Sequence, residues 1–347
     1  MTDTPMAVPE ERWLTHALRP VRRQLDEVSG RMLSQLADPV MRKVVYLITA
    51  GGKRLRPALV LLAGSCGARP DDAGLVTAAA AVEMIHTATL IHDDIIDQSP
   101  LRRAHQAFHH RWGVERAVLT GDHLYAQAFQ WLANLKTPRV MQIMADVCGR
   151  LCRGELREVE ARYRLDLTEA EYFAIIREKT ASLIGGCCES GAVLGGCPPE
   201  AVTRLAAFGV TFGLGFQVMD DCLDVGGDPA RLGKATLSDL DKGVFSLPLI
   251  YLTQRLSPRE RRRLFAPLQR VAGRAGARTW ARRVTAVDPG FMRRVAAAAK
   301  ASGALAQAQA RARELIQESQ AHVAGLSLNG LSAAYDALAS YAMTRHR

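Results

Sequence analysis

Two clusters of aspartates stand out in the sequence, each at the end of an apolar run. In "HTATLIHDDIIDQSPLRR" (86–103) they are Asp93, Asp94 and Asp97, and "VMDDCLD" repeats the pattern at Asp220, Asp221 and Asp224. On a helix, aspartates four residues apart project from one face, where their charges repel. Removing such carboxylates from water is costly unless a cation offsets the charge, and oxygen-only ligands suit Mg²⁺. One cluster alone is also typical of an exposed acidic helix end, but the repeat favours a pair of facing metal sites.

Basic residues near these clusters could hold an anion. A glycine pair in "GGKRLRP" (51–57) is followed by the cations Lys53, Arg54 and Arg56. The segment reads as a junction between a loop and a helix, and backbone amides at a helix start favour phosphate. Arg102 and Arg103 follow the first aspartate cluster, where guanidinium groups could bind phosphate oxygens in pairs.

Long helices must position these groups. The runs 57–66, 73–96, 117–135 and 201–225 are rich in Ala and Leu and do not alternate, which predicts helices rather than strands. Several are apolar almost all round, which indicates central, buried helices, whereas the more polar run 301–326 predicts an outer helix. Gly, Pro and Asp residues separate the runs, and no Gly/Ser linker divides them. We therefore expect a single all-α domain over residues 1–347, with residues 1–14 as a flexible N-terminal segment.

Composition and charge allow several kinds of partner. The chain has 347 residues, of which 48% are hydrophobic, and a formal net charge of +10. This excess could suit nucleic acid, a membrane surface or a phosphorylated substrate. Much of it lies in an arginine-rich stretch over 259–283, which we interpret first as a solvated helix face.

The remaining features indicate a cytoplasmic protein. The N-terminus has no apolar run of the signal-peptide type, and no uninterrupted apolar stretch reaches the roughly 18 residues that span a bilayer. The seven cysteines lack the spacing of zinc ligands, since Cys148 and Cys152 lie four apart and Cys187 and Cys188 are adjacent. We interpret them as small buried residues of a reducing compartment.

The order of the motifs resembles that of the trans-isoprenyl diphosphate synthases, the polyprenyl synthetase family, and most of all its medium- and long-chain members. The resemblance rests on GGKRLRP, on E-x-x-H-x-x-x-L-x-H-D-D-x-x-D-x-x-x-x-R-R, and on "GVERAVLTGDHL", "EKTA", "GFQVMDDCLD" and "GKATLSDLDKG". It runs from about residue 15 to the C-terminal "TRHR". It implies an isoprenoid-synthase-type helical bundle around a deep central cavity, usually assembled as a homodimer. It also implies Mg²⁺-dependent, head-to-tail condensation of isopentenyl diphosphate with an allylic diphosphate.

The resemblance assigns roles to residues of this chain. Up to three Mg²⁺ ions are expected, two at Asp93 and Asp97 and a third at Asp220, helped by Asp221 and Asp224. The expected isopentenyl diphosphate ligands are Lys53, Arg56, His86 and Arg103, and the expected allylic diphosphate ligands are Arg102, Lys179, Thr180, Gln217 and Lys234. The residues expected to act directly in catalysis are Asp93, Asp94, Asp97, Asp220, Asp221, Lys179 and Arg102. No protein nucleophile is required, because metals and cations stabilise the departing diphosphate.

Two positions depart from the family pattern. Ala104 follows the paired arginines where the family has Gly, and Val244 stands where the family has a lysine expected to contact the allylic diphosphate. Lys242, two residues earlier, could substitute for it. The loss of one cation among several predicts weaker stabilisation of the diphosphate rather than its absence.

The resemblance also bears on product length. The family controls it with side chains one turn before the first aspartate cluster, and these positions are Ala88 and Thr89 here. Because neither is aromatic, we expect a product longer than farnesyl, namely geranylgeranyl or beyond.

Three other functions compete with this interpretation. A class I terpene cyclase shares the all-α fold and an aspartate cluster, but it does not need a second diphosphate site. A subunit that depends on a partner, or is not catalytic, is favoured by Val244 and opposed by the two complete aspartate clusters. Nucleic-acid binding by the arginine-rich stretch is disfavoured because stacking aromatics are few there. A peripheral membrane contact of that stretch suits release of a long product better.

Overall fold

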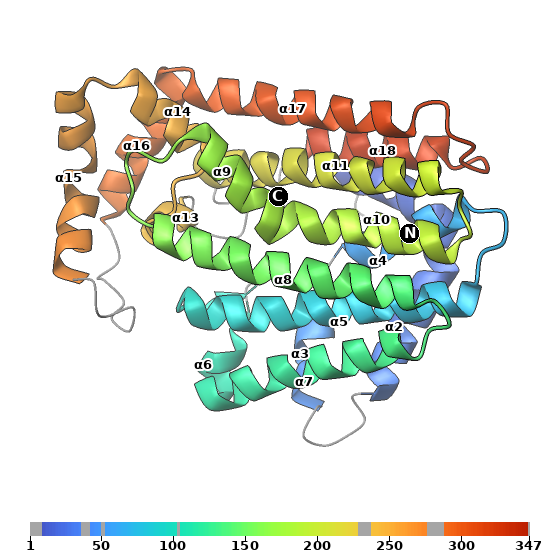
Figure 1. The fold of residues 1–347 in the computed structure, drawn as a ribbon. Helices are drawn as coiled ribbons and strands as arrows, with labels where there is room; N and C mark the ends of the chain where they lie inside the picture. The colour runs from blue at the N-terminus through green and yellow to red at the C-terminus, as the bar shows by residue number, and fades with distance from the viewer. Residues whose placement is uncertain are drawn as a thin grey trace, which may run out of the picture. The chain divides into compact units, whose positions relative to one another are not determined.

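The computed structural model describes residues 9–35, 42–49, 53–102, 105–227, 237–275 and 288–345. It divides into two compact units. Unit 1 comprises Met1–Gly149, Ser182–Val210 and Ser319–Tyr341, and unit 2 comprises Arg150–Ala181, Thr211–Glu318 and Ala342–Arg347. Helices dominate the described residues, which confirms the all-α class (Figure 1). That the whole chain is a single domain stays a prediction.

The helices of unit 1 are α1 (Pro9–Leu18), α2 (Arg22–Gln35), α3 (Arg42–Thr49), α4 (Leu55–Ser65), α5 (Asp72–Ile96), α6 (Phe108–Trp112), α7 (Val114–Ala133) and α10 (Ser182–Leu194). A 3-10 turn, η1 (Arg19–Val21), joins α1 to α2, and two short antiparallel strands, β1 (Leu101–Arg102) and β2 (His105–Gln106), follow α5. Helix α1 includes residues 9–14 of the segment expected to be flexible, and residues 1–8 lie outside the described residues.

The helices of unit 2 are α9 (Glu169–Ile176), α13 (Ser238–Asp241), α14 (Leu247–Arg255), α15 (Pro258–Ala275) and α16 (Pro289–Ala301), with a π-helical turn, η2 (Arg177–Ala181). Among the described helices, four contribute residues to both units: α8 (Pro138–Ala161), α11 (Pro199–Gly226), α17 (Ala304–Val323) and α18 (Ser332–Thr344). The four predicted helical runs correspond to α4, α5, α7 and α11, so these predictions are confirmed.

Helix α5 forms the centre of unit 1 because its side chains are apolar almost all round. Asp71 caps its first turn by accepting a hydrogen bond of 3.1 Å from the amide of Gly74. Between the cap and the aspartate cluster, residues 78–82 are fully buried. The helix packs against α2, α4, α7 and α10, so the expectation of a central buried helix is confirmed (Figure 1).

Helices α4 and α10 approach each other closely through glycines. A Cβ atom at Gly191 would overlap the carbonyl oxygen of Val60, and one at Gly195 would overlap that of Gly64. A backbone atom cannot move aside as a flexible side chain can, so only glycine permits this crossing. The contact fixes α4, and with it the basic motif at the start of α4.

Two predictions on the outer helices hold for the described residues. The buried residues of α17, among them Ala308, Ala312 and Ile316, recur at helical spacing, which confirms an outer amphipathic helix.

In α15, Arg259, Arg262 and Arg263 are exposed. Phe265 and Leu268 are buried, so this part of the arginine-rich stretch is a solvated helix face. Residues 276–287 of that stretch lie outside the described residues, and its membrane contact stays a prediction.

Within the part of the chain that the structure describes, two helices are long and apolar enough to cross a membrane by length and composition alone. They are α5 and α11, whose apolar windows are 78% and 50% buried inside the protein. Burial of this kind is also found in core helices of soluble proteins. The cytoplasmic location stays a prediction.

No disulfide joins the cysteines, all seven of which lie among the described residues. Cys66, Cys187, Cys188 and Cys222 are buried, and burial raises the pKa of the Cys187 thiol to about 12. Cys152 on α8 is exposed, so the expectation that the cysteines are buried is wrong at this position, and Cys148 and Cys197 are only half-buried.

The crossing of α4 and α10 can be tested by adding one methyl group. Because the methyl would overlap backbone, Gly191→Ala should lower the free energy of unfolding by about 1–3 kcal/mol. The control is Gly30→Ala in the exposed part of α2, where no atom lies within 4 Å of the added Cβ. That change should raise the free energy of unfolding by about 0.5–1 kcal/mol. Urea unfolding measures both, and an unchanged midpoint for Gly191→Ala would contradict the packing.

Candidate functional site

The three aspartates of the first cluster occupy the last turn of α5 and its C-cap. The amide of Asp97 donates to the carbonyl of Asp93 at 2.8 Å, so the two residues lie one helical turn apart, as predicted. Both side chains are half-buried, whereas the side chain of Asp94 is only 2% exposed. The spacing therefore places one aspartate inside the protein and two at its boundary with water.

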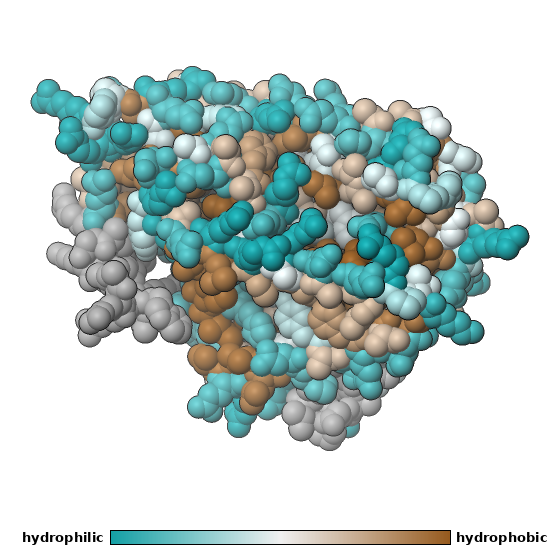
Figure 2. All heavy atoms as spheres, viewed as in Figure 1, coloured by the Kyte–Doolittle hydropathy of each residue, from teal (hydrophilic) through white to brown (hydrophobic). Residues whose placement is uncertain are grey.

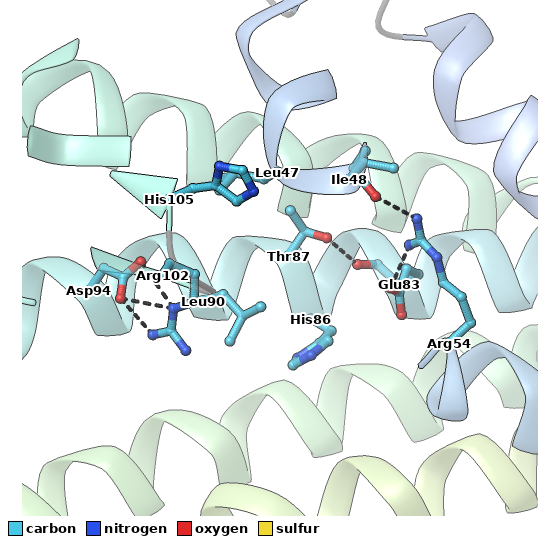
Figure 3. Close-up of a pocket in the computed structure, with 10 residues that line it drawn as sticks. All are labelled: Leu47, Ile48, Arg54, Glu83, His86, Thr87, Leu90, Asp94, Arg102 and His105. Carbon is cyan, nitrogen blue, oxygen red and sulfur yellow. Dashed lines mark hydrogen bonds and ion pairs between the residues drawn. The ribbon is translucent and has the colours of Figure 1, made fainter. Parts of the chain in front are cut away.

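The buried carboxylate of Asp94 forms an ion pair with the half-buried side chain of Arg102 on β1 (Figure 3). The Nη2 and Nε atoms of Arg102 donate to Oδ1 of Asp94 at 2.6 Å and 3.0 Å. Burial alone lowers the pKa of Arg102, but the hydrogen bonds and charge of Asp94, with the charges of Asp93 and Asp97, raise it overall. Arg102 was expected to bind the allylic diphosphate, and in this structure it neutralises Asp94.

The basic motif at the start of α4 lies beside α5. Nη1 of Arg56 is 3.1 Å from Nε2 of His86, so two of the expected isopentenyl diphosphate ligands are in contact. The ammonium of Lys53 lies 5.1 Å from the centre of the Tyr341 ring on α18. A pocket is formed by α3, the N-cap residue of α4, α5, β1 and β2. It is lined by Leu47, Ile48, Arg54, Glu83, His86, Thr87, Leu90, Asp94, Arg102 and His105 (Figure 3).

The two positions expected to control product length differ in exposure. Ala88 is fully buried, whereas Thr89 is half-buried and its hydroxyl donates to the carbonyl of His86 at 2.7 Å. Thr89 is therefore the more accessible of the two. The role of both stays a prediction.

In unit 2, the second aspartate cluster lies on the last turns of α11 and its members have different partners. Nη1 of Arg345 lies 2.6 Å from Oδ1 of Asp220. The guanidinium of Arg345 also lies 4.0 Å from the centre of the Phe216 ring. The ring of Phe216, next to Gln217, therefore contacts the guanidinium of Arg345.

Both carboxylate oxygens of Asp221 accept hydrogen bonds from side chains of the protein. Oδ2 accepts from the hydroxyl of Tyr172 at 2.6 Å, and Oδ1 accepts from Nε2 of Gln217 at 2.8 Å. Burial raises the pKa of Asp221 well above its ordinary value, and the charges of Asp239 and Asp220 raise it further. Its surroundings therefore favour a structural carboxyl group more than a metal ligand.

Asp224 secures the segment that follows the second cluster. Its Oδ1 accepts from the hydroxyl of Ser238 at 2.7 Å, and its Oδ2 accepts from the amide of Asp239 at 3.2 Å. These bonds hold the start of α13, which precedes Lys242 and Val244. The amide of Val244 donates to the carbonyl of Asp239 at 2.9 Å, so the segment folds back on itself.

The structure brings Thr180 and Gln217 together, as expected of two ligands of one site. The hydroxyl of Thr180 donates to Oε1 of Gln217 at 3.0 Å. Lys179 lies in the turn η2 and pairs with Glu155 at 2.8 Å and with Glu158, both on α8. Arg103 and Lys234, also expected to bind diphosphates, lie outside the described residues, as does Ala104.

Sequence reasoning missed several partners of these residues. Glu155 and Glu158 stand in a charged stretch, "RGELREVE", where no pattern distinguishes them from surface acids. Arg345 was visible only as a basic residue near the C-terminus, next to an apolar helix. Tyr172 carried no signal, because it lies 49 residues before its partner Asp221.

The aspartates of the two clusters are suitable ligands for a divalent metal ion. Asp93 and Asp97 present carboxylate oxygens from one helix face, and Asp220 holds a guanidinium, a cation in the place where a metal is expected. Among the described residues, no three carboxylate, imidazole or thiol groups converge on one point. A metal ion there would take its remaining ligands from substrate phosphates and water, which is typical of Mg²⁺.

Comparison with known proteins decides the family. A family model described as polyprenyl synthetase matches residues 38–277. The chain belongs to the polyprenyl synthetase family. The isoprenoid-synthase-type helical fold is confirmed, and so is the enzyme class expected from the sequence, since polyprenyl synthetases are prenyltransferases.

Relatives of this polyprenyl synthetase differ in the products that their names imply. The short chain isoprenyl diphosphate synthase of Methanothermobacter thermautotrophicus is 38% identical over 257 residues, covering 72% of this chain and 78% of the relative. Heptaprenyl diphosphate synthase component 2 of Geobacillus stearothermophilus is 39% identical over 227 residues, covering 65% and 71%. A crystal structure of a polyprenyl synthase from Caulobacter crescentus, complexed with calcium and isoprenyl diphosphate, has a TM-score of 0.86 and 31% identity, covering 96% and 98%.

The ion pair of Asp94 and Arg102 should stabilise the fold. Asp94→Asn leaves a half-buried guanidinium without its counter-charge and should lower the free energy of unfolding by about 2–3 kcal/mol. The control Glu27→Gln breaks the exposed pair with Arg23 on α2 and should cost less than about 0.5 kcal/mol. Urea unfolding compares the two, and equal small effects would show that the Asp94 pair does not hold β1 against α5.

Proposed function

We propose that this protein is a Mg²⁺-dependent trans-polyprenyl diphosphate synthase that condenses isopentenyl diphosphate with an allylic diphosphate. One observation carries the proposal above the others. In unit 1, anion-binding cations and metal-type carboxylates share one rigid scaffold: Arg56 contacts His86 on α5, and Asp93 and Asp97 end the same helix. Sites on rigid helices hold reacting groups with small positional error.

The substrates would be held by their diphosphates. Lys53, Arg56 and His86 would bind isopentenyl diphosphate, whereas Arg102, Lys179, Thr180 and Gln217 would bind the allylic diphosphate. A guanidinium binds phosphate oxygens in pairs and so fixes orientation as well as charge. Orientation matters here, because the two reacting carbons must be held in contact before any bond breaks.

The reaction then needs charge stabilisation rather than a protein nucleophile. Up to three Mg²⁺ ions would be held by Asp93 and Asp97 and by Asp220, and when bound they would neutralise the departing diphosphate. Asp221 and Asp224 would help indirectly, by fixing the end of α11 and the segment after it. The allylic carbon–oxygen bond breaks and the diphosphate leaves with the electron pair. The double bond of isopentenyl diphosphate attacks the allylic carbon, a new carbon–carbon bond forms, and a proton passes to the released diphosphate. Apolar helices exclude the water that would otherwise trap the allylic cation.

The product should be longer than farnesyl. Ala88 is fully buried and Thr89 is small, so no aromatic ring stands one turn before Asp93. The names of the two relatives extend from short-chain to heptaprenyl synthases, which leaves geranylgeranyl and longer products within the family's range.

A partner-dependent subunit is the second candidate. It is supported by the relative that is named as component 2 of a heptaprenyl diphosphate synthase, and by Val244 in place of the family's lysine. The complete aspartate clusters favour an enzyme that works without a different partner. A class I terpene cyclase is less well supported, because the cations around α4 would have no second diphosphate to bind.

The deciding experiment incubates the purified chain with labelled isopentenyl diphosphate and, separately, with dimethylallyl, geranyl, farnesyl or geranylgeranyl diphosphate. With Mg²⁺ we expect elongation to a product of 20 carbons or more, and with excess chelator we expect none. Chromatography after dephosphorylation measures the length. Thr89→Phe should shorten the product, because the ring would fill the space next to the growing chain.

Each outcome of this experiment discriminates between the candidates. If a folded protein elongates none of the allylic diphosphates, the proposal that the chain is active without a different partner is wrong. If Val244→Lys then restored elongation, the missing cation would be responsible. If it did not, the partner-dependent subunit would be favoured.

We also propose that the protein is a homodimer. Unit 1 exposes large apolar side chains at the end of α5, in β1 and at the start of α7, namely Ile96, Leu101, Val114, Val118 and Leu119. Figure 2 shows apolar residues gathered in the region where Figure 1 draws the C-terminal end of α5 with α6 and the start of α7. A contiguous apolar patch of this kind is typical of an interface, and a two-fold pairing would bury it on both copies.

The dimer is tested by analytical ultracentrifugation. The wild-type chain should sediment with the mass of two copies, and Val118→Glu with Leu119→Glu should sediment as one, because four charges would otherwise be buried at the interface. Leu33→Glu on α2 is a control at an exposed apolar residue away from the patch and should leave the dimer intact. A monomeric wild type would contradict the proposal.

A further inference from the structure

The three cations of the basic motif each contact a different group. Lys53 lies over the ring of Tyr341, and Arg56 contacts His86 on α5. Arg54, between them in the sequence, points to Glu83 and Ile48 (Figure 3). The proposed function uses Lys53 and Arg56 as diphosphate ligands and leaves Arg54 without a role.

Arg54 joins the motif to two helices. Its Nη1 donates to Oε1 of Glu83 on α5 at 2.7 Å, and its Nη2 donates to the carbonyl of Ile48 on α3 at 2.7 Å. Its backbone has φ of 47°, in the left-handed region, at the N-cap position of α4. A residue other than glycine adopts this conformation at a cost, so surrounding contacts must hold it there. The two hydrogen bonds of the guanidinium are such contacts.

Glu83 is the buried partner that makes this arrangement specific. Its side chain is 10% exposed, and a carboxylate so buried needs a counter-charge. It precedes His86 by three residues, so it lies one turn away on the same face of α5. The contacts Arg54–Glu83 and Arg56–His86 therefore join the start of α4 to α5 at two successive turns.

We propose that Arg54 and Glu83 are positioning residues for the isopentenyl diphosphate site, an inference that rests on the proposed function. Their ion pair neutralises the charge of Arg54 inside the protein and holds the loop in its left-handed turn. Lys53 and Arg56, on either side, are thereby fixed toward the diphosphate. Arg54 does not bind substrate. A shift of these ligands by about 1 Å would weaken the oriented contacts with the diphosphate severely.

The test is a mutant cycle with both Michaelis constants measured. Arg54→Met should raise the KM for isopentenyl diphosphate roughly ten- to a hundredfold, because it releases the loop. Glu83→Gln keeps an acceptor but loses the charge and should give a smaller rise. For each variant the KM for the allylic diphosphate should stay within about twofold, since the displaced ligands serve only one substrate.

The double variant tests whether the two residues act as one unit. Arg54→Met with Glu83→Gln should bind isopentenyl diphosphate no worse than Arg54→Met alone, because both changes remove the same interaction. It also removes the buried carboxylate that Arg54→Met leaves unpaired, so it should fold even where the single variant does not. The control Glu189→Gln breaks the more exposed pair with Arg139 in unit 1 and should leave both KM values unchanged.

Several results would overturn the inference. An equal rise in both KM values would indicate general damage to the fold. If the rise in the KM for isopentenyl diphosphate in the double variant equals the product of the rises in the two single variants, the two residues act independently. Retention of the wild-type KM in Arg54→Met would show that the loop needs no such support. If the wild type does not elongate any primer, the proposed function fails instead. Calorimetric binding of inorganic diphosphate to the wild type and to Glu83→Gln then tests the positioning role, which predicts weaker binding to the variant.

Discussion

The neutralisation of buried charge is the constraint on which this structure depends. The helices that carry the chemistry are apolar, yet each carries acids that lose hydration when the helices pack. Asp94 is neutralised by Arg102, and Glu83 by Arg54. Asp221 is stabilised differently from these ion pairs, because burial raises its pKa and the hydroxyl of Tyr172 donates a hydrogen bond to it. Removal of one partner from such a pair costs more than the pair contributes, which couples the acids to the fold.

This constraint divides the aspartates of each cluster into two kinds. In the first cluster Asp94 supports the fold, whereas Asp93 and Asp97 remain at the boundary with water. In the second cluster Asp221 and Asp224 bind groups of the protein, and Asp220 holds the guanidinium of Arg345. A helix with adjacent aspartates cannot point both into one site, because successive residues project about 100° apart. The second aspartate of each pair is thus available to fix the helix that presents the first.

Rigid backbone packing supports the same arrangement. The glycine contacts of α10 with α4 hold the two helices close, and the hydrogen bonds of Arg54 tie the N-cap of α4 to α3 and α5. Prenyl transfer by ionisation needs oriented diphosphates more than it needs a reactive side chain. A scaffold of packed helices with internally neutralised charges meets that need, and it explains why so many of the site residues have partners within the protein.

The sequence by itself determined the helices, the order of the motifs and the family. Helical periodicity and apolar composition are local properties, and they identified α4, α5, α7 and α11 without any tertiary information. The i, i+4 spacing of Asp93 and Asp97 was equally local. Only the tertiary structure decided the partners of the charges, because Arg102 and Asp94 or Arg54 and Glu83 meet through the fold and not through spacing. The exposure of Thr89 against the burial of Ala88, and the contact of Arg345 with Asp220 from the far end of the chain, were decided in the same way. A side chain's type shows what it could bind, but the packing of its helix selects the group that it contacts.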